Sequence, residues 1–301
     1  MTRRAVRAET PVVVQALLTG AVDYAGTYPP AGHTVDAALA QYAEARGSAS
    51  AWLLGRLVLP AATTPALEET LAPWTDASAP WPVTVVLGED PLADAARVSD
   101  TPLTRATITS VEFRPRSAEA IALVTDAVPP GTEVYVEVPP GAALDGWLER
   151  IAAAGARAKI RTGGTSGDLF PAPDAVAQWL AACLRHGVRL KATAGLHHAL
   201  NGEYPLTYAP GSPTASMLGF LNLLVAAAAL SDGATVGDAA ALLARGDAPS
   251  LAADGTVLHW GEYRLTADAA LHARRRLIDG FGSCSVAEPA DDLHRLGWIP
   301  R

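Results

Sequence analysis

Apolar and polar positions along the chain follow two alternating periods, one typical of strands and the other typical of helices. In residues 133–138, valine occupies every second position with polar side chains between. Residues 144–151 instead place apolar side chains at the helical spacing i, i+3, i+4 and i+7. The pattern predicts eight strands, at residues 21–24, 52–59, 82–87, 108–113, 133–138, 156–161, 188–193 and 256–260.

Strand–helix alternation repeated about eight times predicts a parallel α/β fold. The length of 301 residues suits a (β/α)8 TIM-type barrel with extra N- and C-terminal helices. An open doubly wound sheet is the alternative, but charged residues recur inside several strands, which suits a barrel interior better. We expect a single barrel domain over residues 1–301, with an inserted helical region around 199–250.

Three parts of the chain are harder to interpret. Residues 11–18 suit either a short helix or an early strand. Residues 201–213 are predicted to form a polar loop, with a length that is typical of functional loops. Residues 214–230 are predicted to form one long apolar helix. The GFGSCS sequence at 280–285 reads as a turn before a last helix at 289–296.

Composition narrows the classes of partner. The net charge is −8 and there is no basic block, so we expect neither nucleic acid nor an anionic membrane as a partner. The longest apolar run, 218–230, is too short to span a bilayer, and the first fourteen residues show no cleavage site of a signal peptide. We therefore predict a cytoplasmic protein with a small-molecule substrate, and association into a homo-oligomer is left open.

No motif for a nucleotide or a metal is present. The chain has no GxGxxG or GxxxxGK[ST] sequence, and its two cysteines form no metal-binding pattern, so we predict no cofactor and no metal. Cys284 has no histidine at motif spacing and is interpreted as a turn thiol.

Two lysines stand out because each lies inside a predicted strand with inward parity. Lys159 and Lys191 are 32 residues apart, close to one strand–helix–strand unit. Neighbouring strands are about 4.8 Å apart, so the two amines are expected to lie close together. Like charges at that range lower a lysine pKa, and a neutral amine is a nucleophile. Glu137 has the same parity on the preceding strand and is the predicted proton carrier. A structural network of buried ion pairs is the alternative.

Further polar residues are expected at the carboxyl ends of the strands, where barrel enzymes place their substrates. His197 and His198 suit acid–base chemistry or substrate contact better than metal ligation, which would need further ligands. The predicted substrate-binding residues are Asp23, Glu112, Arg161, Thr193, His197 and His198.

Around the two lysines, the chain resembles the deoxyribose-phosphate aldolase family. The family's K-T-S-T-G-F is similar to the sequence KIRTGG at 159–164, and its K-A-S-G-G is similar to KATAG at 191–195. Arg161 replaces a small polar residue, and a double histidine follows the second motif. The resemblance covers about 40 residues and implies a (β/α)8 class I aldolase. It further implies that Lys159 forms the Schiff base, that Lys191 tunes it, and that Asp23 matches an acidic residue ending strand one.

These observations favour a class I aldolase-like lyase that acts on a small carbonyl substrate, sugar-derived in the family, through a lysine Schiff base. A barrel isomerase or hydrolase that uses Lys, His and Glu for acid–base catalysis without a covalent step is the second hypothesis. A non-catalytic ligand-binding barrel is the third.

Overall fold

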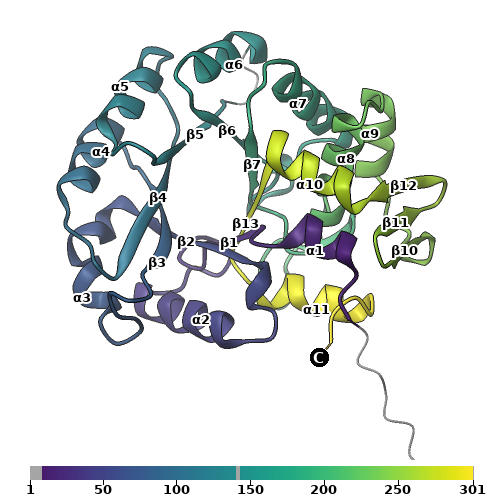
Figure 1. Cartoon of the computed structure of the whole chain (residues 1–301), viewed down its shortest axis with the longest axis horizontal. Coiled ribbons are helices and arrows are strands. Elements are labelled where there is room, and N and C mark those ends of the chain that lie inside the picture. The colour runs from purple at the N-terminus through teal and green to yellow at the C-terminus, as the bar shows by residue number, and fades with distance from the viewer. Residues whose placement is uncertain (1–8, 140–142, 301) are drawn as a thin grey trace, which may run out of the picture.

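Eight parallel strands close into a barrel in the computed structural model, which describes residues 9–139 and 143–300 (Figure 1). The predicted TIM-type (β/α)8 architecture is confirmed. Residues 1–8, part of the N-terminal segment in which no signal peptide is expected, lie outside the described residues. In their order around the barrel, the strands are β1 (Val22–Tyr24), β13 (Ile278–Ser283), β7 (Leu190–Thr193), β6 (Arg157–Arg161), β5 (Glu133–Glu137), β4 (Ala106–Phe113), β3 (Trp81–Val86) and β2 (Leu54–Pro60).

Helices surround the barrel because the outward side of each strand is apolar and needs a cover. They are α1 (Val12–Leu18), α2 (Val35–Gly47), α3 (Leu67–Leu71), α4 (Pro91–Asp100), α5 (Glu119–Ala127), α6 (Leu144–Ala153), α7 (Pro173–Arg185), α8 (Phe220–Ser231), α9 (Val236–Leu243), α10 (Ala267–Arg276) and α11 (Ala287–Arg295). The ambiguous segment 11–18 is therefore an extra N-terminal helix, α1. Short 3-10 helices occupy Ala51–Leu53, Ala61–Ala66, Gly167–Leu169 (η3) and Ala248–Ser250.

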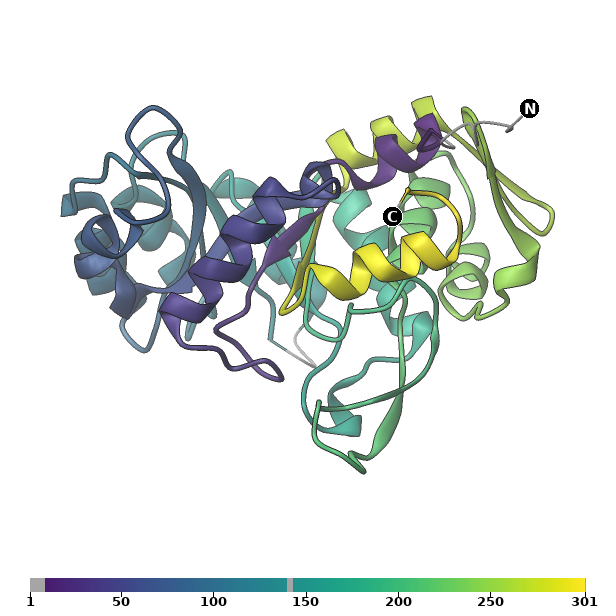
Figure 2. The same cartoon turned by 90° about the horizontal axis from the view of Figure 1, so that it is seen from below.

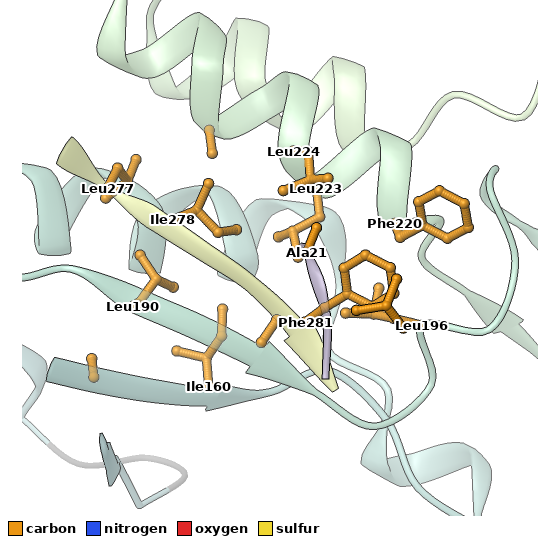
Figure 3. Packing of buried hydrophobic residues seen from close by; sticks show 14 of the residues in the cluster. Ala21, Ile160, Leu190, Leu196, Phe220, Leu223, Leu224, Leu277, Ile278 and Phe281 are labelled. Carbon is orange, nitrogen blue, oxygen red and sulfur yellow. The ribbon is translucent and has the colours of Figure 1, made fainter. Parts of the chain in front are cut away.

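Helix α8 shows how the outer layer packs. All but the last of its twelve residues are buried, so the helix is apolar on every side. Its Phe220, Leu223 and Leu224 face Ile278 and Phe281 of β13 (Figure 3), and the rings of Phe220 and Phe281 stack with centroids 5.1 Å apart.

The prediction of strand eight was wrong. Val257–Trp260 is a strand, β11, but it belongs to a separate antiparallel sheet with β10 (Leu251–Asp254) and β12 (Tyr263–Thr266). The eighth barrel strand is β13, whose GFGS residues were read as a turn. Glycine usually marks turns, whereas here Gly280 lies where a Cβ would be 2.3 Å from the carbonyl oxygen of Ala21, so only glycine fits between β13 and β1.

The segment after β7 also differs from the prediction. The long helix expected at 214–230 begins only at Phe220, because residues 214–217 form strand β9 (Thr214–Met217). This strand pairs with β8 (Gly202–Pro205), which lies in the predicted loop 201–213. The β8–β9 hairpin and the η3 segment project together from one end of the barrel, whereas α1 and α10 lie at the opposite end (Figure 2).

The barrel interior is unusually polar. Alternate residues of each strand point inward, and the inward set includes many charged side chains, consistent with the alternation in the sequence. Thr84 and Ser110 hydrogen bond to each other at 2.7 Å in the interior. The buried charged residues are Asp23, Glu112, Glu137, Lys159, Lys191 and Asp292, and all but Asp292 lie on barrel strands.

Candidate functional site

A cavity of about 300 Å³ opens at the carboxyl ends of the barrel strands. This is the end at which barrel enzymes bind their substrates. Strands β4, β5 and β6 contribute Glu112, Glu137 and Lys159 to its floor. Arg161, Thr193 and His197 stand nearer the mouth, and all six of these residues were predicted from the sequence.

The two lysines are direct neighbours across the β6–β7 pair. Glu112 lies between them: its Oε1 is 2.5 Å from the Nζ of Lys191 and its Oε2 is 2.7 Å from the Nζ of Lys159. The Lys191 Nζ also donates to Asp23 Oδ2 at 2.5 Å. Lys191 is buried and does not line this cavity, whereas Lys159 forms part of the cavity wall.

Glu137 joins the buried network to the cavity mouth. Its Oε2 is 3.1 Å from the Nζ of Lys159, and its Oε1 accepts from Arg114 at 2.5 Å and Arg161 at 3.3 Å. Arg114 and Arg161 are partly exposed, so this carboxylate is the link between the interior and solvent.

The network keeps its carboxylates ionised. Burial raises the pKa of Glu112, but the attraction of Lys159 and Lys191 is stronger and the result is a pKa of about 2. Burial likewise raises the pKa of Glu137, but Lys159 and Arg161 bring it to about 2. Burial lowers the pKa of Lys191, and Asp23 and Glu112 more than offset this, so the pKa of Lys191 lies above its usual range. Lys191 therefore keeps its positive charge beside Lys159.

These shifts predict acid sensitivity. The ordinary pKa of a glutamate is 4.5, so between pH 4.5 and 2 the unfolded chain binds protons at Glu112 and Glu137 that the folded chain does not. Their contribution is complete above pH 4.5 and is lost as the pH falls toward 2, a loss on the order of a few kcal/mol. Urea denaturation at pH 7, 5, 4 and 3 measures it. Glu137→Gln is expected to flatten this pH dependence, and equal stability of the unmodified chain at pH 7 and 3 would contradict it.

The glycine turns after β6 and β7 bring the two lysine-bearing strands together. A Cβ on Gly163 would lie 2.9 Å from the Cα of Gly195, and Gly195 has a φ of +76°. Thr162 donates its hydroxyl hydrogen to the carbonyl oxygen of Ala194 at 2.8 Å and ties the turns to each other. Side chains at these glycines would separate the strands, which explains why glycine occurs in both motifs.

Two of the predicted substrate-binding residues lie away from the cavity. Asp23 is buried below it, where it binds Lys191 and the backbone N–H of Arg56. His198 points elsewhere: its Nδ1 is 3.4 Å from Asp292 Oδ2, and its ring stacks on Tyr204 with centroids 3.7 Å apart. Adjacent residues point apart in this loop, so His197 reaches the cavity and His198 does not.

Cys284 was interpreted as a turn thiol, but it lies on the cavity wall beside His197, with Sγ 3.8 Å from Nδ1. Glu288 Oε2 is 3.3 Å from the same nitrogen. Burial lowers the pKa of His197, but hydrogen bonds with Cys284 and Glu288 raise it to about 9. The imidazole is 87 residues from Cys284 in the sequence, so no motif spacing could reveal the contact.

Within residues 9–139 and 143–300, no group of three or more His, Cys, Asp or Glu side chains is arranged to hold a metal ion. The helices of the same part of the chain include none long and apolar enough to cross a membrane.

Comparisons with known proteins identify no family. No protein-family model matches the chain, and no curated protein matches it. A solved structure of nitroalkane oxidase from Streptomyces ansochromogenes is similar at 17% sequence identity with a TM-score of 0.34. The match covers 62% of this chain and 61% of that chain, so it spans about three fifths of the nitroalkane oxidase.

Proposed function

We propose that this protein is a class I aldolase-like lyase that binds a small carbonyl substrate as a Schiff base on Lys159. One observation carries the proposal. The chain contains 23 lysine and arginine residues, of which only Lys159 and Lys191 are lysines, and these two are neighbours inside the barrel. A guanidinium provides charge but is no nucleophile, so chemistry that needs an amine is a reason to keep lysine at these positions.

The cavity supplies a path for the reaction. The Nζ of Lys159 lies at the wall where a carbonyl carbon can approach, and the amine attacks once it has given up its proton. Lys191 holds a positive charge on the neighbouring strand, directly opposite Lys159. Because the pKa of Glu137 is about 2, this carboxylate is a weak base, and a water molecule beside it can relay the proton away from the amine.

Polar groups at the mouth favour a substrate with oxygen substituents. Arg161, Thr193 and His197 surround the opening above Lys159. A sugar-derived aldehyde or ketone presents hydroxyl groups that these side chains can bind. The volume of about 300 Å³ suits such a small molecule.

One observation favours a second function, acid–base catalysis without a covalent step. Lys159 lies between two carboxylates, 2.7 Å from Glu112 and 3.1 Å from Glu137, and ion pairs stabilise the charged amine. In an isomerase or hydrolase of this kind, Lys159 serves as an acid or an anion clamp. Substrate-dependent proton exchange without a trapped adduct would favour it.

The direct test is reduction with borohydride in the presence of acetaldehyde, glyceraldehyde, dihydroxyacetone or pyruvate. Apart from the α-amine, the chain offers only two primary amines, so the adduct has almost no background. We expect one reduced adduct per chain, mapped to Lys159 by peptide mass spectrometry. Adducts at neither lysine with a broad panel of aldehydes and ketones would reject the Schiff base. If both lysines affect only stability and no carbonyl is turned over, the third hypothesis, a ligand-binding barrel, is favoured.

The site residues and the cytoplasmic location stay predictions, as does assembly into a homo-oligomer. The single-domain assignment is likewise a proposal. Activity measured with the unmodified chain addresses the site residues, and its mass in solution addresses assembly into a homo-oligomer.

A further inference from the structure

A second charged cavity lies at the opposite end of the barrel, at the amino ends of the strands. Its volume is about 230 Å³, and Arg56, Arg157, Arg189, Arg274 and Lys191 line it together with acidic side chains. The arginines on β2 and β6 stand at or near the strand starts, and Arg189 directly precedes β7. Arg274 comes from α10, the helix that covers this end with α1 (Figure 2).

The charges of this lining do not cancel. Five cationic side chains face three carboxylates, those of Asp23, Glu133 and Asp279. Lys191 also pairs with Glu112 outside this lining, so the excess positive charge comes from the four arginines. Asp279 pairs with both Arg157 and Arg189, and Glu133 pairs with both Arg56 and Arg157. Each of these two carboxylates is therefore shared between two guanidinium groups.

Arg274 is the least compensated of these cations. It makes no ion pair with a carboxylate of the described residues and instead donates to the backbone carbonyls of Leu17, Thr19 and Asp279. Burial lowers its pKa, as expected for a desolvated charge that lacks full balance.

Two donors at this end are unused. The Nε atoms of Arg189 and Arg274 are buried, and neither has a hydrogen-bond partner in the part of the chain that the structure describes. Unsatisfied buried donors are costly, by about 1–3 kcal/mol each, and charged ones by more. A cavity that combines excess positive charge with unused guanidinium donors suits an oxyanion, which accepts several hydrogen bonds and neutralises charge.

We propose that this amino-terminal cavity is an anion site that binds a small doubly charged oxyanion of the phosphate class, with Arg189 and Arg274 as its main donors. The volume is below the range of about 300–1,000 Å³ that is usual for drug-sized ligands, so the ligand is small. The site lies at the other end of the barrel from the cavity of Lys159 and does not depend on the Schiff-base chemistry.

Binding of inorganic phosphate to the intact chain tests the proposal. We expect saturable one-site binding by calorimetry at low ionic strength, with a melting temperature that rises with phosphate more than with sodium chloride of equal ionic strength. Sulfate is expected to replace phosphate and acetate to bind more weakly, because the site favours two charges. Absence of saturable phosphate binding overturns the proposal.

The next residue on α10 provides a matched control. Arg275 is exposed and carries the same charge as Arg274. Arg274→Gln and Arg189→Gln are each expected to weaken phosphate binding at least about tenfold, and Arg275→Gln to leave it unchanged. An equal loss of phosphate binding in all three variants would show that long-range charge attracts the anion. A loss found only in Arg161→Gln would show that phosphate binds in the other cavity. Either result overturns the proposal.

A measurement on the unmodified chain covers the case in which a variant fails to fold. Phenylglyoxal modifies arginine, and peptide mass spectrometry reports each site. Phosphate is expected to protect Arg189 and Arg274 and to leave Arg275 equally reactive. Protection of none of them, or of all three equally, overturns the site.

Discussion

The Lys159→Met variant is expected to form no borohydride-reducible adduct and to lose turnover by a factor on the order of 10⁴ or more, as enzymes do when they lose a nucleophile. The physical reason is that no other lysine borders the cavity: Lys191 lies below it, bound to Asp23 and Glu112. Intact-mass measurement after reduction, combined with a carbonyl-release assay, gives both readouts.

Two further variants separate loss of the amine from loss of charge. Lys159→Arg keeps a cation between Glu112 and Glu137 and is expected to fold but to form no adduct. Arg161→Gln removes a cation that also contacts Glu137 while keeping both amines, so an adduct is expected to form. An adduct that persists in Lys159→Met and maps to Lys191 would reverse the assigned roles.

The Lys191→Met variant is expected to lose about 3–5 kcal/mol of the free energy of unfolding, the largest stability effect that we predict. Lys191 is 2% exposed and binds two carboxylates, so its removal leaves Asp23 and Glu112 with less compensation in a buried site. Urea denaturation measures the change through the midpoint at constant slope.

A surface pair and a double variant provide the controls. Arg116→Met breaks an exposed ion pair with Glu89, and little change is expected because such pairs contribute little. Lys191→Met combined with Asp23→Asn is expected to lower the free energy of unfolding by less than the sum of the two single changes. The reason is that Asp23→Asn removes the carboxylate that Lys191→Met leaves without its partner. A loss below about 1 kcal/mol in Lys191→Met would show that the buried ion pairs matter little for stability.

The barrel could be predicted because its signals are local. The alternation of Glu133, Tyr135 and Glu137 with valine is visible within one strand, and so is the inward parity of Lys159 and Lys191. Parity and a parallel sheet together place these side chains in one interior, and the structure brings the two lysines to directly paired positions.

The prediction of strand eight was wrong because it, too, relied on a local signal. Val257–Trp260 has strand alternation, but alternation does not say which strand will pair with it, and its partners are its own neighbours in sequence. In β13, by contrast, glycine is needed at position 280 because the backbone of Ala21, just before β1, is close. A local pattern cannot show such an approach.

The sequence by itself determined the class of fold, the inward direction of the charged residues and the scarcity of lysine, because these depend on periodicity and composition. Only the tertiary structure decided how charges are shared: that Glu112 bridges both lysines, that Glu137 reaches Arg114, and that Cys284 meets His197. Those contacts join residues many positions apart. Each contact depends on closure of the barrel and on the paths of the loops. The residues near each position in the sequence do not specify either.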